Sequence, residues 1–234
     1  MEKAVDVKTK EEWEEMIEVP YARDFDNGYY SLEGSVVRSR EDLSLIYGLS
    51  NYSKIEWNWH QYCPTRLPTL EQLIFDLLMQ TDKRPDARFC DLGIGTGQVQ
   101  AVFAALGFRS YGVDISAKAL DHSQPYYERV QAELGRFRHS PVVERCDVLS
   151  EEFSSFTFTD GTRMEDMDIL FCHIGDYPAT WVDIMKRLPN MKNGSVWLNY
   201  FIMFIRPKDF PHTIMDTPFR PIHPNCYHSL LMAK

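Results

Sequence analysis

The chain has 234 residues, of which 25 are Lys or Arg and 34 are Asp or Glu, so its formal charge is −9. This length can bury a full hydrophobic core, and a hydrophobic content of 44% argues against a disordered chain. The net negative charge argues against electrostatic binding of nucleic acid by the whole surface, because such binding needs surplus basic residues. Only residues 181–234, with 7 basic and 3 acidic residues, suit an anionic partner. Ordinary scatter of surface charge explains the same asymmetry.

Several patterns bear on the compartment and on metals. The N-terminus lacks the apolar core of a secretory signal, and the longest apolar stretch, 196–205, is shorter than the roughly 20 residues of a membrane-spanning helix. The five cysteines are scattered, which suits reduced, buried thiols. We therefore expect an intracellular chain without membrane contact. The spacing of His223, Cys226 and His228 offers metal ligands but lacks a fourth partner, so no metal is predicted.

The first part of the chain is predicted to form a small, mainly helical N-terminal lobe over residues 1–60. Residues 9–17 can form an amphipathic helix, and 21–37 has the composition of loops. A short helix should begin at Ser39 and end near Gly48. An aromatic, proline-bearing loop follows over 58–68. Thr69 and Gln72 have the spacing of a capping box, which predicts a helix opening at Thr69.

From Ala87 onward, strand-like and helix-like segments alternate, and residues 61–234 are predicted to form one domain. The predicted strands cover 88–92, 109–114, 142–147, 168–173 and 195–201. The predicted helices cover 98–106, 117–134 and 180–188. Such alternation indicates an α/β fold with a parallel sheet and helices on both faces. The end, 224–233, offers further strand material that can pair antiparallel at one edge.

A glycine-rich turn joins the first of these strands to its helix. Gly93 and Gly95 permit a tight turn and let a ligand approach the backbone closely. The helix from Gln98 presents free N–H groups at its positive end. Asp91 precedes the first glycine and can receive an amine. This turn is the crevice where open α/β sheets bind ligands.

Two more acids end the next two strands. Asp114 stands about twenty residues after the turn, where a carboxylate accepts the hydroxyls of a ribose. Asp147 ends the third strand and can accept from the exocyclic amine of an adenine, with Val148 beside the ring. A dinucleotide fold prefers a different glycine spacing that admits a pyrophosphate, whereas an acid beside the first glycine repels phosphate and suits an ammonium.

This set resembles the class I, S-adenosylmethionine-dependent methyltransferases, which implies a seven-strand Rossmann-like sheet and this cofactor. Three acids at three successive strand ends are more specific than the glycine turn alone. The alternative from the residues themselves is an α/β domain whose glycines serve turns and whose aspartates cap helices.

Three stretches resemble a narrower family, the non-SET histone-lysine methyltransferases called disruptor of telomeric silencing: 91–99 (DLGIGTGQV), 147–153 (DVLSEEF) and 188–194 (LPNMKNG). A compact core without a long basic tail is more similar to the trypanosomatid branch of that family. The resemblance implies a cofactor site with S-adenosylhomocysteine as product and these residues: Tyr62, Thr69, Asp91, Gly93, Gly95, Gln98, Asp114, Asp147 and Val148. Arg66–Thr69 replaces that family's usual loop.

The same resemblance implies an acceptor site. Tyr227 matches a tyrosine of the target-lysine channel, and His173 stands where the family has asparagine. His173, Tyr177 and Tyr227 are therefore the candidate catalytic residues. An aromatic sleeve would favour the uncharged amine by desolvation. Its candidates are Trp59, Tyr62, Tyr177, Phe219 and Tyr227, each of which is more often a core aromatic when considered singly.

The implied reaction is methyl transfer to a lysine in the core of histone H-three on nucleosomes, in the nucleus, by a monomer. A weak DNA contact would come from basic residues near the C-terminus: Lys186, Arg187, Lys192, Arg206, Lys208 and Arg220. Two alternatives stay open. One is a class I methyltransferase of a small molecule or another protein, with His173 as base. The other is an inactive scaffold that binds S-adenosylmethionine.

Overall fold

The computed structural model describes residues 32–50, 65, 67–173, 178–188, 190–199, 216–221 and 230–233. They form one sheet in the order β3-β2-β1-β4-β5-β7-β6. Five strands make its parallel part: β1 (Arg88–Leu92), β2 (Arg109–Asp114), β3 (Val142–Arg145), β4 (Ile169–Cys172) and β5 (Val196–Asn199). β7 (Leu230–Ala233) pairs antiparallel with both β5 and β6 (Phe219–Pro221). The predicted antiparallel edge is confirmed, whereas the three-residue β6 was not predicted.

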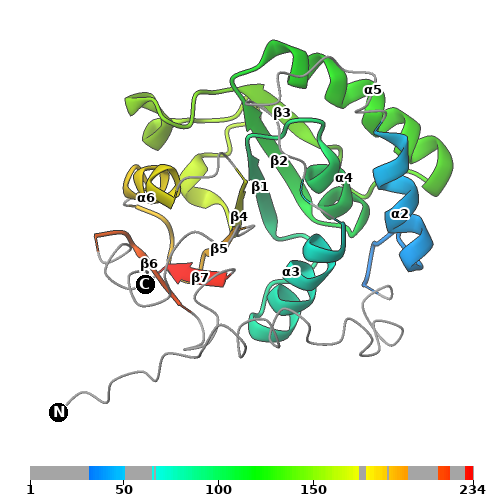
Figure 1. Ribbon diagram of the computed structural model, residues 1–234, viewed down its shortest axis with the longest axis horizontal. Coiled ribbons are helices and arrows are strands. Elements are labelled where there is room, and N and C mark those ends of the chain that lie inside the picture. The colour runs from blue at the N-terminus through cyan, green and yellow to red at the C-terminus, as the bar shows by residue number, and fades with distance from the viewer. Residues whose placement is uncertain are drawn as a thin grey trace.

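The strand order creates a switch point between β1 and β4. The chain leaves β1 toward β2 and β3 on one side, and returns to β4 and β5 on the other (Figure 1). In open α/β sheets this point, at the carboxyl ends of the strands, is where ligands bind. The predicted α/β architecture with a parallel sheet is confirmed, and the site must be sought at this edge.

Helices cover both faces of the sheet (Figure 1). α2 (Arg40–Leu49), α3 (Leu67–Gln80), α4 (Gln98–Ala105) and α5 (Ala117–Leu134) lie on one side, and α6 (Pro178–Lys186) lies on the other. Two short 3-10 helices, Glu151–Ser155 and Met164–Asp166, follow β3. In the described part of the chain, no helix is both long and apolar enough to cross a membrane.

The start of α3 differs from the prediction. α3 begins at Leu67, so Thr69 lies inside its first turn and is not the cap that precedes the helix. Gln72 donates instead to the Asp76 carboxylate, 2.9 Å away and one turn further along. Pro68 is compatible with this earlier start, because a proline in the first turn removes no intrahelical hydrogen bond.

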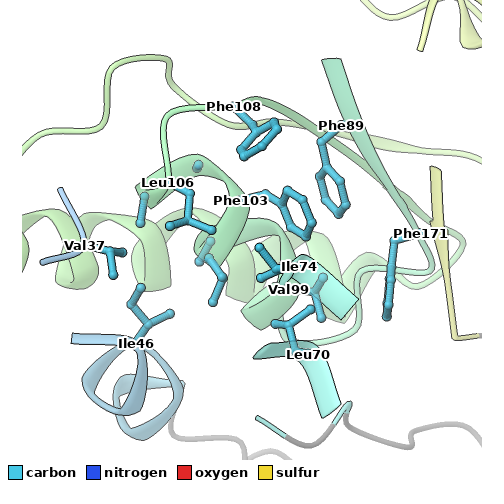
Figure 2. Packing of buried hydrophobic residues seen from close by; sticks show 14 of the residues in the cluster. Val37, Ile46, Leu70, Ile74, Phe89, Val99, Phe103, Leu106, Phe108 and Phe171 are labelled. Carbon is cyan, nitrogen blue, oxygen red and sulfur yellow. The ribbon is translucent and has the colours of Figure 1, made fainter. Parts of the chain in front are cut away.

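Alternating side chains of the central strands build a core on each face. Phe89 of β1 points to the side of α2–α5 and stacks on Phe103 of α4, with ring centroids 3.7 Å apart (Figure 2). Cys90 and Trp197 point to the other side, toward α6. Strands buried on both faces are typical of parallel sheets. This double burial fixes the strand register, and with it the positions of the strand ends.

The described part of the predicted N-terminal lobe packs on the same core. Leu43 and Ile46 of α2 are fully buried in one cluster with residues of α3, α4 and α5. Arg40 also pairs with the buried carboxylate of Glu71 on α3, at 2.9 Å. The boundary near residue 60 and the helix at 9–17 lie outside the described residues, and both stay predictions.

Candidate functional site

The glycine-rich turn after β1 folds over the end of β2. The backbone N–H groups of Gly93 and Ile94 donate to the carbonyl of Val113, at 2.8 and 3.1 Å. The N–H of Gly95 donates to Oδ2 of Asp114, at 3.0 Å. Gly93 and Gly95 have φ of 85° and 53°, the left-handed region that glycine adopts without strain. The predicted turn and the predicted ribose acid therefore form one unit.

The third glycine of this turn has a packing role. Gly97 has φ of 78°, and a Cβ added there would lie 2.6 Å from the hydroxyl of Tyr127 on α5. Tyr127 also donates to the side chain of Gln100, at 2.5 Å. Gly97 thus lets α5 approach the turn, and that side of the turn is filled by protein rather than open to a ligand.

Asp91 lies beneath the turn. Its side chain is 2% exposed, and it accepts a hydrogen bond from the backbone N–H of Gln100, near the start of α4. Burial first, and then the neighbouring Asp114 carboxylate, raise the pKa of Asp91 well above its usual range, while the Gln100 bond partly offsets them. The sequence predicts that Asp91 can receive an amine, and the structure adds that its carboxyl group is buried.

Asp114 ends β2 and is partly exposed, whereas Asp147 lies two residues past β3, which ends at Arg145 and not at the predicted residue 147. Asp114 accepts from the N–H of Ser116 at 2.8 Å, besides its bond from Gly95. Asp147 is exposed and accepts from the N–H of Leu149 at 2.9 Å. Because a carboxylate offers about four acceptor positions, both acids retain capacity for hydroxyl or amine donors of a ligand.

Apolar surface beside these acids comes from residues that the prediction missed. Val148 was expected next to the adenine, but it is 7% exposed and packs in the core on the α6 side of the sheet. Ile115 and Leu149, which directly follow Asp114 and Val148, are 58% and 45% exposed. Large apolar side chains left open next to two carboxylates can contact a flat aromatic ring. Ile115 directly follows Asp114 and Leu149 lies two residues after Asp147, and the sequence did contain this signal.

Gln98, a predicted cofactor residue, connects two helices. Its Nε2 donates to Oγ of Ser50 at 2.9 Å and lies 3.4 Å from the carbonyl oxygen of Tyr47. Both partners lie at the end of α2. Gln98 therefore fixes α2 against the first turn of α4, directly after the glycine-rich turn.

His173 is the one candidate catalytic residue among the described residues. It follows β4 at the level where Gly93 follows β1, because Leu92 and Cys172 are register partners. Its Nδ1 lies 3.0 Å from Oγ1 of Thr65, just before α3. This position places an imidazole at the carboxyl end of β4, next to the switch point between β1 and β4.

The other predicted acceptor residues are distributed differently. Trp59, Tyr62, Tyr177 and Tyr227 lie outside the described residues, as does the side chain of Thr69. Phe219 does not belong to an aromatic sleeve, since it is fully buried on β6 and packs on Trp197, with ring centroids 5.5 Å apart.

Asn199 is a residue that the prediction missed. It ends β5 opposite Cys172 and is almost fully buried. Its Oδ1 has no hydrogen-bond partner within the part of the chain that the structure describes. A buried amide oxygen without a partner costs stability, so its position at the carboxyl edge is consistent with a ligand contact. No described residues form a group of three or more metal-ligating side chains, and His223, Cys226 and His228 are not among those described.

Comparison with known proteins gives only distant similarities. No protein-family model and no curated protein matches the chain. A Methanobacterium thermoautotrophicum structure described as precorrin 8W decarboxylase is 19% identical, over 72% of this chain and 80% of that one, with a TM-score of 0.48. A TehB-like S-adenosylmethionine-dependent methyltransferase from Corynebacterium glutamicum is 10% identical, over 82% and 96%, with a TM-score of 0.45.

A third solved structure holds S-adenosylhomocysteine: the Pyrococcus abyssi tRNA (uracil-54, C5)-methyltransferase. It is 16% identical, over 74% of this chain and 39% of that one, with a TM-score of 0.45. The chain spans about half the length of several other solved structures that it matches, 45%, 54% and 49%. Scores this low carry no argument about function, which must come from the residues of the site.

Proposed function

We propose that the protein is an S-adenosylmethionine-dependent methyltransferase of the class I type. The observation that carries the proposal is the pair of carboxylates of Asp114, which ends β2, and Asp147, which follows the neighbouring β3, with Ile115 and Leu149 exposed beside them. Asp114 can accept ribose hydroxyls, Asp147 can accept an exocyclic amine, and the two apolar side chains can contact the adenine. These residues fit the nucleoside part of the cofactor.

The surroundings of the turn favour this cofactor over a dinucleotide. A pyrophosphate needs donors and positive charge at the turn, but here the carboxyl group of Asp91 lies beneath it. In addition, Tyr127 occupies the space beside Gly97. Carboxylates at this position suit the ammonium and sulfonium groups of S-adenosylmethionine, as a simple matter of charge.

Methyl transfer requires that some residues position the cofactor and that others handle the acceptor. The cofactor supplies, when bound, an electrophilic methyl group. The glycine-rich turn and the strand-end acids fix the position of the cofactor, and orientation of this kind lowers the barrier. His173, beside the turn, can accept the proton that the acceptor loses near neutral pH. Asn199, at the end of β5, can orient an acceptor N–H or O–H.

The acceptor is proposed to be a small molecule, with His173 as the base. The histone-lysine alternative rests on the resemblance of stretches 91–99, 147–153 and 188–194 alone, and its channel tyrosines lie outside the described residues. The nucleosome as partner and the nucleus as location belong to that alternative. The described residues that could handle an acceptor are His173 and Asn199, and neither requires a histone substrate.

Transfer of a radiolabelled methyl group tests the proposal and separates its versions. The wild-type protein is incubated with labelled S-adenosylmethionine and, in separate reactions, with a panel of small amines and phenols, free histones, and nucleosomes. Labelling of small acceptors alone supports the proposal, and labelling of nucleosomes alone supports the histone alternative. Binding of the cofactor without labelling of any acceptor supports the scaffold alternative.

A further inference from the structure

Asp91 is surrounded by groups that do not neutralise its charge. Asp114 from the end of β2, Tyr127 from α5 and Cys90 beside it on β1 all interact with it electrostatically. β4 places Phe171 opposite Asp91 and the buried thiol of Cys172 opposite the next residue, Leu92, with His173 following. From α4, the backbone N–H of Gln100 is the donor. No cation is among these described neighbours.

The carboxyl groups of Asp114 and Asp91 differ in the number of backbone N–H groups that donate to them. Asp114 accepts two backbone N–H groups, from Gly95 and Ser116, and its oxygens therefore act as a carboxylate acceptor pair. Asp91 is 2% exposed and receives one backbone N–H. A second negative charge next to the first, away from water and without a cation, is strongly unfavourable. The raised pKa of Asp91 agrees with this geometry.

We propose that Asp91 holds a proton in the ligand-free protein and releases it to solvent when a ligand with an ammonium group occupies the glycine-rich turn. The carboxyl O–H bond breaks, the proton passes to the buffer, and the carboxylate left behind is stabilised by the positive charge of the ligand. The inference rests on the proposed function, because S-adenosylmethionine supplies that ammonium and a sulfonium as well.

The affinity for the ligand should therefore depend on pH and should fall as the pH falls. Because binding releases a proton, affinity falls by up to about tenfold for each pH unit below the titration midpoint of ligand-free Asp91. 5′-Methylthioadenosine keeps the adenine and ribose but carries no cation. Its binding should release no proton, and its affinity should not follow this dependence on pH.

Calorimetric titration in two buffers of different ionisation enthalpy counts the protons. Below the titration midpoint of ligand-free Asp91 we expect up to about one proton released for each S-adenosylmethionine bound and none for 5′-methylthioadenosine. Asp91→Asn should still bind the cofactor, more weakly, without proton release. Asp147→Asn, the matched change at an exposed carboxylate just past β3, should weaken binding but keep the release. Thermal unfolding checks that both variants are folded.

The outcomes separate the inference from the proposed function. If the wild-type protein does not bind S-adenosylmethionine, the proposed function fails. Binding without proton release, or release that persists in Asp91→Asn, overturns the inference and leaves the proposed function intact. A measurement without ligand adds an independent check: carboxyl ¹³C resonances of the wild type, assigned by comparison with Asp91→Asn, should show Asp91 titrating above the ordinary range. A midpoint in the ordinary range overturns the inference.

Discussion

The Asp114 carboxylate accepts the backbone N–H of Gly95 at 3.0 Å, and this bond joins the turn after β1 to the end of β2. The residue that we propose for the ribose therefore also shapes the turn that we propose for the methionine part. Loss of this one side chain should therefore affect both halves of the cofactor site.

Asp114→Ala should lower the affinity for S-adenosylmethionine at least about tenfold, because a hydrogen bond donated to a charged group contributes about 1.5–3 kcal/mol. Hydrogen exchange of the Gly95 amide should become faster in the same variant. Asp121→Ala, on the exposed face of α5, is the matched control and should change neither property. An unchanged affinity in Asp114→Ala contradicts the ribose assignment.

The neighbours Val148 and Leu149 should respond in opposite ways to the same substitution. Leu149→Ser should weaken cofactor binding by roughly 1 kcal/mol, through lost apolar contact, and leave stability almost unchanged. Val148→Ser should lower the free energy of unfolding by about 1–3 kcal/mol, because the residue is buried. Calorimetric binding and urea unfolding of both variants test this. A binding defect confined to Val148→Ser at full stability would restore Val148 as the adenine contact.

Gly97→Ala should destabilise the fold by more than a positive φ alone explains. Gly161 has a similar φ of 85° but nothing within 4 Å of an added Cβ, so Gly161→Ala measures the backbone cost alone, about 1 kcal/mol. At Gly97 the Cβ would meet the Tyr127 hydroxyl, which adds about 1–3 kcal/mol. Equal losses of unfolding free energy in the two variants would contradict the packing role of Gly97.

Asp91→Asn should make the ligand-free protein more stable near neutral pH. Since burial and Asp114 raise the pKa of Asp91 in the folded state, the folded state binds the proton more tightly than the unfolded chain. The stability of the wild type therefore falls as pH rises above the ordinary carboxyl range. The amide of Asp91→Asn does not titrate, so the variant should gain about 1–3 kcal/mol of unfolding free energy over the wild type. The gain should vanish as pH falls to about 4.

Asp168→Asn should have the opposite effect on stability to Asp91→Asn. Burial raises the pKa of Asp168, but hydrogen bonds from Lys192 and from the Arg88 N–H outweigh it and leave that pKa lowered. Its contribution is present above the ordinary carboxyl range and is lost as pH falls. Asp168→Asn should therefore destabilise the protein near neutral pH by about 1–3 kcal/mol. Urea unfolding across pH measures the difference in unfolding free energy between each variant and the wild type. This difference should change with pH in opposite directions for the two variants.

The sequence predicted best those elements whose limits are local. β1, β2 and α5 have the predicted bounds, because apolar strand runs and the Gly135 stop are read directly from neighbouring residues. The start of α3 was misplaced, since a capping-box pattern does not exclude a turn of helix before it. β6 is only three residues long and exists through its pairing with β7, a tertiary interaction.

The candidate site shows the same limit. Its acids and glycines could be found from their spacing, because each lies at or near the end of a strand or forms a turn. The burial of Asp91, the contact of Gly97 with Tyr127 and the orientation of Val148 depend on how α4, α5 and the sheet pack together. Phe219 was assigned to a sleeve from its residue type alone, and its place against Trp197 depends on β6.

Equilibrium binding of S-adenosylmethionine, with NAD as competitor, tests the central claim most directly. A nucleoside site with carboxylates against the glycine-rich turn should bind one S-adenosylmethionine for each chain, and NAD should not displace it. The same titration on Asp121→Ala should match the wild type. Failure of the wild type to bind S-adenosylmethionine, or its displacement by NAD at similar concentration, would contradict the claim.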